Sequence, residues 1–207
     1  MRFESRHSAG TLLAAKLEYK HAVVLGIPRG GVAVAAPIAE KLKCPLGAVV
    51  AKKIALPSDP ELAFGAMARF GDPIYDEAAL AHVDITDEQL RSLEEKIRNE
   101  IERREQMFER RIPLEERNVV IVDDGLATGY TMLAALQSVP EAARRIVAVP
   151  VSSLPAYEMV KKRCDEIVCL HVADMPFFAV GSLYDDFHDM TDEEVISILE
   201  KTNKRVV

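Results

Sequence analysis

Apolar runs alternate with polar stretches along most of the chain and predict alternating strands and helices. Runs rich in valine and isoleucine are typical of strands buried on both faces of a parallel sheet. Apolar residues that recur every three or four positions predict amphipathic helices. Strands are expected at His21–Ile27, Leu46–Lys53, Asn118–Val122, Arg145–Val151 and Glu166–His171. Helices are expected at Ser8–Leu17, Val32–Leu42, Thr86–Arg111 and Thr131–Gln137, and from Thr191 onward.

This alternation predicts an α/β fold in which a mostly parallel, twisted sheet carries helices on both faces. Two strand–turn–helix units support it, with turns at Pro28–Gly31 and Asp123–Gly129. The segment between them has a different pattern. Ala55–Tyr75 is rich in proline and glycine, which predicts a loop or an irregular hairpin.

The long helix expected at Thr86–Arg111 has signals at both ends. Thr86 and Gln89 fit a capping box, and the basic pair Arg110-Arg111 suits the negative end of the helix dipole. The apolar stripe consists of Leu90, Leu93, Ile97, Ile101 and Phe108. We expect the stripe to cover the sheet or a partner subunit, and the charged residues to form a solvated outer face.

Composition and charge narrow the class of protein. The chain has 207 residues, 49% of them hydrophobic, and a formal net charge of −7. An acidic balance argues against a general nucleic-acid binder, but a local basic pocket for a small anion is compatible with it. The sequence has no apolar run near the ~20 residues that span a bilayer, and its first six residues lack an apolar signal core. We expect a cytoplasmic protein with a single domain, residues 1–207, and no nucleic-acid or membrane partner.

Cysteine and histidine residues give no signal for a metal site. Cys44, Cys164 and Cys169 fit no zinc spacing, and the last two are expected to be small core residues. The histidines are scattered, at His7, His21, His82, His171 and His188.

The most informative stretch is Asn118–Thr131. Its apolar strand delivers Asp123 and Asp124 to the carboxyl end of the sheet, where ligands of open α/β sheets bind. Adjacent buried carboxylates need a cation or hydroxyl donors, so the pair suits Mg²⁺ or a vicinal diol. The following turn offers backbone N–H groups, hydroxyls and a helix N-terminus, which together can hold a phosphate. The candidate phosphate-binding residues are Gly125, Ala127, Thr128, Gly129 and Thr131.

A second candidate anion site is the turn Pro28–Gly31. Arg29 supplies a fixed positive charge, and Gly30 and Gly31 allow backbone N–H groups to approach an anion. Two glycines after a strand can equally be a tight turn alone. Lys52 and Lys53, at the end of the next expected strand, either reach the same anion or are ordinary surface charges.

The string Val-Val-Ile-Val-Asp-Asp-Gly-Leu-Ala-Thr-Gly-Tyr-Thr at 119–131 resembles the phosphoribosyl-pyrophosphate (PRPP) signature of type I phosphoribosyltransferases. The resemblance implies that Asp123 and Asp124 contact the ribose 2- and 3-hydroxyls and that Ala127–Thr131 wraps the 5-phosphate. Pro-Arg-Gly-Gly at 28–31 resembles the family's pyrophosphate loop, which implies a cis peptide between Pro28 and Arg29. The resemblance also makes 55–111 an insertion with the mobile catalytic loop and a long helix, and 172–190 a hood over the acceptor.

End to end, the chain resembles a group of bacterial and archaeal proteins predicted to be phosphoribosyltransferases. The shared features are Phe3–Arg6 with Ala9-Gly10, the Pro-Arg-Gly-Gly turn, Glu61-Leu62-Ala63 with Gly65-Ala66, and Ala179-Val180-Gly181 with Tyr184 and Phe187.

The function that the resemblance implies is transfer of the 5-phosphoribosyl group from PRPP to a nitrogen nucleophile such as a nucleobase, with release of pyrophosphate. Catalytic roles would fall to Arg29, Asp123 and Asp124. PRPP would be bound by these residues together with Gly30, Gly31, Lys53, Gly125, Ala127, Thr128, Gly129 and Thr131. Mg²⁺ is the expected cofactor, held by Asp123 and Asp124 directly or through ribose hydroxyls or water. A homodimer would be ordinary for such a fold.

Other functions fit parts of the pattern. A PRPP-binding regulator on the same fold would bind without turnover; its expected mark is a basic nucleic-acid face or an added DNA-binding module. A receiver-type signalling domain also has Asp-Asp after an apolar strand, but there the pair closes the first strand of a shorter domain. A P-loop nucleotide hydrolase needs Gly-Lys-Ser/Thr after a glycine-rich loop, which the sequence lacks. The regulator is the alternative that we retain.

Overall fold

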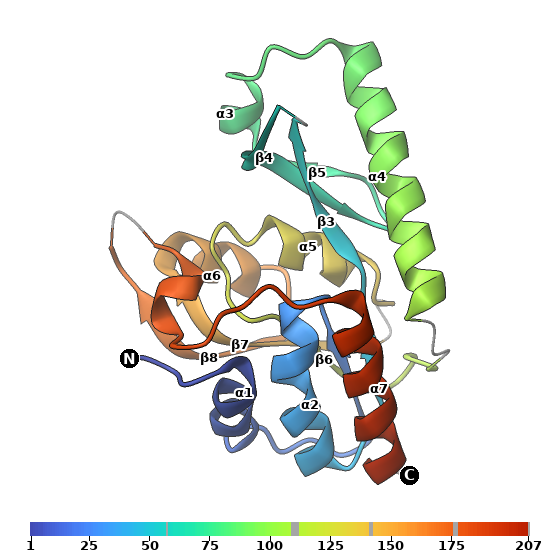
Figure 1. Ribbon diagram of the computed structural model, residues 1–207, viewed down its shortest axis with the longest axis vertical. Helices are drawn as coiled ribbons and strands as arrows, with labels where there is room; N and C mark the ends of the chain where they lie inside the picture. The colour runs from blue at the N-terminus through green and yellow to red at the C-terminus, as the bar shows by residue number, and fades with distance from the viewer. Residues whose placement is uncertain (57, 109–111, 141–142, 176–177, 207) are drawn as a thin grey trace.

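Two β-sheets and the helices around them make up the computed structural model, which describes residues 1–56, 58–108, 112–140, 143–175 and 178–206 (Figure 1). The larger sheet has the order β2-β1-β6-β7-β8, and every neighbouring pair in it is parallel. Its strands are β1 (Ala22–Gly26), β2 (Leu46–Ala48), β6 (Asn118–Val122), β7 (Arg144–Ser153) and β8 (Glu166–Ala173). The predicted α/β class and mostly parallel sheet are therefore confirmed.

The larger sheet is buried on both faces because its strands alternate apolar side chains between two cores. Val24 and Val120 pack in one core, whereas Val23 and Val119 pack in the other. Helices α1 (Arg6–Ala14), α2 (Gly30–Leu42) and α7 (Asp192–Val206) cover the first face, and α5 (Tyr130–Gln137) and α6 (Leu154–Lys161) cover the second (Figure 1). Period-two alternation between two apolar environments explains why these strands read as uninterrupted apolar runs.

A second sheet lies beside the first and is antiparallel, in the order β3-β4-β5. Its strands are β3 (Ala51–Leu56), β4 (Asp59–Ala68) and β5 (Ile74–Tyr75), and they are followed by α3 (Glu77–Leu80) and α4 (Asp87–Met107). The pairing of β3 with β4 shifts register around Ala55, so the alternative of an irregular hairpin describes this segment better than a loop.

The single strand expected at Leu46–Lys53 is wrong. The chain leaves the larger sheet after Ala48 and enters the second sheet at Ala51. Val49 and Val50 are buried at the crossing, so no polar residue in the sequence marks the break between the two strands.

Helix ends follow the capping signals. The Thr86 hydroxyl accepts the Gln89 N–H, and the Gln89 side chain accepts the Thr86 N–H. Thr191 and Glu194 form the same reciprocal pair before α7. Ser5 caps α1, which therefore begins two residues earlier than expected, at Arg6. Arg110 and Arg111 lie outside the described residues.

Within the described ranges, no helix combines the length and the apolar character that crossing a membrane requires. Cys164 and Cys169 are half-buried against the second core. Burial raises the pKa of each thiol to about 11, so both are held as unreactive thiols.

Candidate functional site

The two glycine-containing turns lie side by side because β1 and β6 are neighbours in the larger sheet. Gly26 is paired with Val122, and the Ile27 N–H donates to the Val122 carbonyl at 2.8 Å. From β1 the chain proceeds to β2 on one side, whereas β6 lies on the other side, so the sheet order reverses between β1 and β6. Such a reversal opens a crevice at the carboxyl ends of the strands.

The first turn contains a cis peptide between Pro28 and Arg29, as the resemblance implied. Helix α2 begins at Gly30, immediately after it. A Cβ atom on Gly30 would lie 2.0 Å from Asp124 Oδ2 and 2.6 Å from Arg6 Nε. Only glycine lets the first turn approach the carboxylate of the second turn this closely.

Asp123 and Asp124 follow β6. Their carboxyl groups are both buried and lie close enough for their charges to repel each other. Burial, followed by the charge of Asp124, raises the pKa of Asp123 well above its usual range. Burial also raises the pKa of Asp124, and a hydrogen bond from Arg6 partly offsets that rise. One Asp123 oxygen, Oδ1, accepts the Asp124 N–H at 2.9 Å. A cation or hydroxyl donors would relieve both carboxylates.

Arg6 is a residue of this site that sequence reasoning did not assign to it. Its Nε donates to Asp124 Oδ2 at 2.8 Å, its Nη1 donates to the His188 carbonyl at 2.9 Å, and its guanidinium stacks 3.8 Å from the centre of the Phe187 ring. The side chain is only 10% exposed. A signal was present, because an arginine in the first turn of a helix opposes the helix dipole and so needs another reason to be there.

The loop after the aspartates is fixed to the neighbouring strand β7. The Leu126 N–H donates to the Val151 carbonyl at 2.9 Å, and the Ser153 hydroxyl donates to the Ala127 carbonyl at 2.7 Å. Gly129 has φ +87°, which lets the chain turn into α5 at Tyr130. Ala127 and Thr128 are exposed at the tip, where their backbone can face an anion.

The segment expected to be a hood packs against the same turn. A Cβ atom on Gly125 would lie 2.6 Å from Val180, so Gly125 makes room for this segment. The Tyr184 hydroxyl donates to the Asp124 carbonyl at 2.7 Å. Phe178 and Val180 pack around the small core formed by Phe3 and Tyr184. Pro176 and Phe177 lie outside the described residues.

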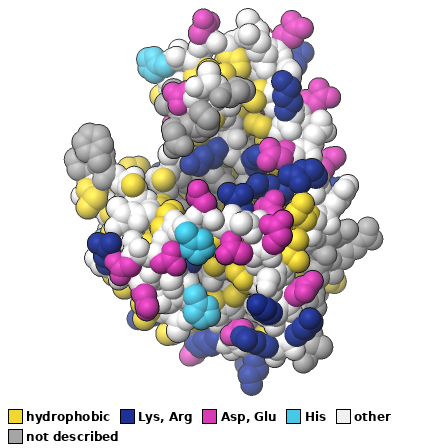
Figure 2. Space-filling view, in the orientation of Figure 1, with side chains coloured by type: hydrophobic (Ala, Val, Ile, Leu, Met, Phe, Trp, Pro, Cys, Tyr) yellow, Lys and Arg dark blue, Asp and Glu magenta, His cyan; other side chains and the backbone are white. Residues whose placement is uncertain are grey.

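A cavity of about 380 Å³ joins the two turns to the second sheet. Its wall includes Arg29, Gly30, Lys52, Lys53, Arg104, Asp123, Asp124 and Thr131. Gly31 does not line it, because Gly31 faces the Val122 carbonyl instead. Figure 2 shows lysine and arginine side chains gathered between the upper and lower parts of the molecule.

The two neighbouring lysines face different surroundings. Lys52 forms an ion pair with Glu100 of α4. Lys53 is exposed, and its positive charge counteracts part of the pKa rise that burial causes at Asp123 and Asp124. Lys53 is therefore the lysine whose charge acts on the aspartates, and the choice between an anion site and surface charges stays a prediction for both lysines.

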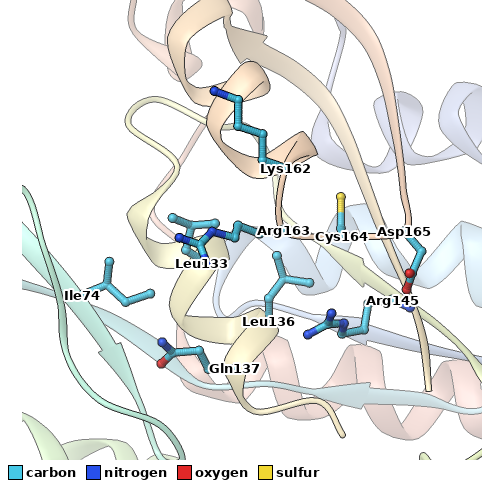
Figure 3. A pocket seen from close by; sticks show the side chains of 9 residues that line it. All are labelled: Ile74, Leu133, Leu136, Gln137, Arg145, Lys162, Arg163, Cys164 and Asp165. Carbon is cyan, nitrogen blue, oxygen red and sulfur yellow. Dashed lines mark hydrogen bonds between the residues drawn. The ribbon is translucent and has the colours of Figure 1, made fainter. Parts of the chain in front are cut away.

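Another hollow, of about 580 Å³, lies at the opposite edge of the larger sheet, near the start of β7, where Arg145 is in its wall (Figure 3). Lys162, Arg163 and Asp165 in its wall are exposed. It contains none of the residues expected from the two turns, and it lies away from the carboxyl ends of the strands. The cavity between the two turns is therefore the stronger candidate.

Known proteins share this chain's sequence and fold. A family model described as phosphoribosyl transferase domain matches residues 3–186. Two Mycobacterium tuberculosis proteins, from strains CDC 1551 and H37Rv, carry the provisional name phosphoribosyl transferase, and each is 38% identical over 210 residues. The alignment covers 98% of this chain and 47% of each relative, so the chain spans about half their length.

A solved structure is also similar to this chain in both sequence and fold. The crystal structure of TT1426 from Thermus thermophilus is 40% identical, with a TM-score of 0.74, and the match covers 97% of this chain and 99% of that one. The family expected from the strings at 28–31 and 119–131 is thus confirmed. This chain belongs to the phosphoribosyl transferase family.

Proposed function

We propose that the cavity between the two turns binds PRPP and that the protein transfers its 5-phosphoribosyl group to a nitrogen nucleophile, a nucleobase being the proposed class. The supporting observation is the placement of Asp123, Asp124 and Arg29 in the wall of one cavity. Carboxylates suit the ribose hydroxyls, and a guanidinium suits a phosphate.

The proposed orientation of PRPP follows from the sheet order. The loop 127–131 is fixed to β7 on one side of β6, whereas Arg29 follows β1 on the other side. A sugar held over Asp123 and Asp124 would therefore direct its 5-phosphate to the loop and its pyrophosphate to Arg29, Gly30 and Lys53. Backbone N–H groups at the starts of α2 and α5 suit the two anionic ends.

The two carboxylates could bind a divalent cation together with oxygen atoms of the ligand. Burial and mutual repulsion raise the pKa of both aspartates, and a cation would relieve this. In the described part of the chain, no group of three or more His, Cys, Asp or Glu side chains could hold a metal ion. PRPP oxygens and water would therefore complete the coordination of Mg²⁺ by Asp123 and Asp124. When bound, Mg²⁺ would neutralise charge on the pyrophosphate.

In the proposed reaction, the acceptor nitrogen forms a bond to ribose C1 as the bond from C1 to pyrophosphate breaks. Positive charge grows on the ribose ring and negative charge on the leaving group. A carboxylate about 5 Å from that positive charge stabilises it by about 3 kcal/mol at an effective dielectric near 20. Arg29 would stabilise the departing pyrophosphate. Val180, packed over Gly125, would contribute to an apolar wall for a flat acceptor.

A direct test combines PRPP binding with turnover. Wild-type protein should bind PRPP with Mg²⁺ in calorimetry and release pyrophosphate with at least one base from a panel. The double variant Asp123→Asn/Asp124→Asn should lose PRPP binding while keeping its fold. Asp185→Asn/Asp186→Asn is the matched control, because this second adjacent acidic pair is exposed, at 58% and 59%.

The outcomes separate the proposal from its alternative. PRPP binding without turnover on any acceptor would identify a PRPP-binding regulatory protein on this fold. Absence of PRPP binding by the wild type, or equal binding by the double variant, would contradict the proposal. Arg29→Ala should weaken binding of pyrophosphate more than binding of ribose 5-phosphate; equal losses would contradict the proposed orientation.

A further inference from the structure

The apolar stripe of α4 is interrupted by a charged residue. Ile97, Ile101 and Phe108 are buried in the first core, at 8%, 0% and 6% exposure. At helical spacing, the position between Ile101 and Phe108 on that face is Arg104. Its side chain is 17% exposed, whereas its neighbour Arg103 is exposed. A cation on a buried stripe opposes the helix's own packing pattern, and such exceptions are typical of functional or strained positions.

The Arg104 guanidinium has one buried donor without a hydrogen-bond partner among the described residues. Its Nε is buried and has no hydrogen-bond partner within the described ranges. The nearest carboxylate oxygens are Glu100 Oε1, 3.7 Å from Nε, and Asp192 Oδ1, 3.9 Å from Nη2. Both distances exceed a hydrogen bond. A buried donor without an acceptor is unfavourable, so the present arrangement leaves the guanidinium suited to an acceptor that a ligand in the cavity would bring.

Arg104 faces the candidate cavity together with Arg29, Lys52 and Lys53. The Lys52 ammonium already contacts Glu100, so it is less available to a ligand. Asp123 and Asp124, the acidic residues of the wall, are assigned above to the ribose. The remaining cations therefore surround a space that suits a strongly anionic group.

The position of α4 indicates which anionic group of PRPP would lie near Arg104. Its Phe108 end lies close to Leu46 of β2 and Leu199 of α7, beyond β1. The loop 127–131 is fixed to β7, and Gly129 lies against α6, on the far side of β6. Arg104 thus lies on the Arg29 side of β6, in a cavity wall that it shares with Thr131, the last residue of that loop.

Given the proposed function, we infer that Arg104 is a pyrophosphate-binding residue, contributed by the inserted segment rather than by either turn. Its planar guanidinium would donate to two pyrophosphate oxygens at once, which a lysine at the same position could not do. The inserted segment would then distinguish PRPP from ribose 5-phosphate, because only PRPP carries a group that reaches α4.

Calorimetric titration of Mg-pyrophosphate, Mg-PRPP and ribose 5-phosphate tests this inference. Arg104→Gln should weaken binding of pyrophosphate and PRPP about 10- to 100-fold, the usual effect of losing hydrogen bonds to a charged group. Binding of ribose 5-phosphate should change less than about twofold. Arg104→Lys, which keeps the charge and loses the fork, should give an intermediate loss. Arg103→Gln, the same change on the exposed face, should match the wild type.

Distinct results overturn the inference and the proposed function. If wild type binds PRPP and Arg104→Gln binds pyrophosphate equally well, Arg104 is not a ligand contact and the proposed function stands. A loss that is the same for ribose 5-phosphate would also overturn the inference, because it would mean general damage to the site. If Arg104→Gln does not fold, Arg104→Lys decides by the same comparison. Failure of the wild type to bind PRPP overturns both.

Discussion

Arg6 and Asp124 are separated by 118 positions in the chain and form a largely buried ion pair beside the candidate cavity. The arginine holds the carboxylate against Gly30, so one contact fixes the acidic turn relative to the first turn. Removing one partner of such a pair leaves the other charge buried without compensation, which costs much more than loss of a surface pair.

Arg6→Met should therefore lower the free energy of unfolding by about 3 kcal/mol, and adding Asp124→Asn should recover part of that loss. Urea unfolding of the four proteins of the double-mutant cycle measures both effects. Arg2→Met is the matched control, because Arg2 pairs with Asp185 at the surface and should cost less than about 1 kcal/mol. Similar losses for both arginines would contradict this account.

The turn that contains Asp123 and Asp124 should also make the free energy of unfolding depend on pH. Burial and Asp124 raise the pKa of Asp123, so the folded protein binds this proton more tightly than the unfolded chain does. The contribution of Asp123 to stability then falls as pH rises from about 4 through the raised folded-state pKa. Without ligand, the gain in unfolding free energy from Asp123→Asn should be larger at pH 8 than at pH 5. Equal gains in guanidinium unfolding at both pH values would count against the raised pKa.

At the scale of single residues, the sequence predicts a site residue when its immediate neighbours in the chain already form a recognisable motif. Asp123, Asp124 and Arg29 stand in short strings whose neighbours already suggest an anion or sugar site. Arg6 and Arg104 do not, because the groups that they contact are far along the chain or on another element. The charges of α4 were expected to form a solvated face, and Arg104 departs from that expectation.

The two turns that follow β1 and β6 pack against each other through a close approach of their backbones. The first turn packs against the second without a side chain at Gly30. A methyl group there would meet a carboxylate oxygen held by Arg6, so relief requires movement of the turn itself.

Gly30→Ala should therefore abolish PRPP binding and destabilise the protein by about 2 kcal/mol, as overpacking usually does. In Gly47→Ala the new methyl group would meet only the ends of Leu25 and Ile112, at 3.0 and 3.1 Å. That variant should unfold close to the wild type and retain binding. Calorimetry and thermal unfolding of both variants test this, and normal PRPP binding by Gly30→Ala would rule out the packing argument.

The sequence predicted those elements that carry a clear local signal, such as an uninterrupted apolar run or a capping motif. Asn118–Val122 was predicted with its observed bounds, the capping box at Thr86 was predicted where it forms, and the last helix was predicted to start at Thr191, which caps α7. The second sheet was predicted only as one of two alternatives, an irregular hairpin without strand bounds, because alanine and glycine dominate 63–68 and leave no period-two contrast. Helix α6 was missed, although Ser153 caps it and proline follows in its first turn.

The whole molecule places the cavity where its two sheets and α4 meet (Figures 1 and 2). A ligand there would contact both turns of the larger sheet and the inserted segment together. Because it would bind the folded state alone, such a ligand should stabilise the entire chain.

Mg-PRPP at 100 times its dissociation constant should add about 2.7 kcal/mol to the free energy of unfolding. For a chain of this size, that corresponds to a rise in Tm of roughly 5–10 °C. Differential scanning fluorimetry measures the rise, and EDTA should reduce it if Mg²⁺ contributes to binding. Ribose 5-phosphate should give a smaller rise, since it lacks the pyrophosphate. No rise with saturating PRPP would contradict binding at this cavity.

The opening residues have a practical bearing on how the protein is produced. The Phe3 N–H donates to the Leu183 carbonyl, Phe3 packs on Tyr184, and Arg6 holds Asp124. An affinity tag fused directly before Met1 would crowd these contacts, whereas α7 ends at the lower edge of the molecule, well clear of them (Figure 1). Assays should therefore use a carboxyl-terminal tag, and a tag-free amino terminus is the first thing to verify when a preparation is inactive.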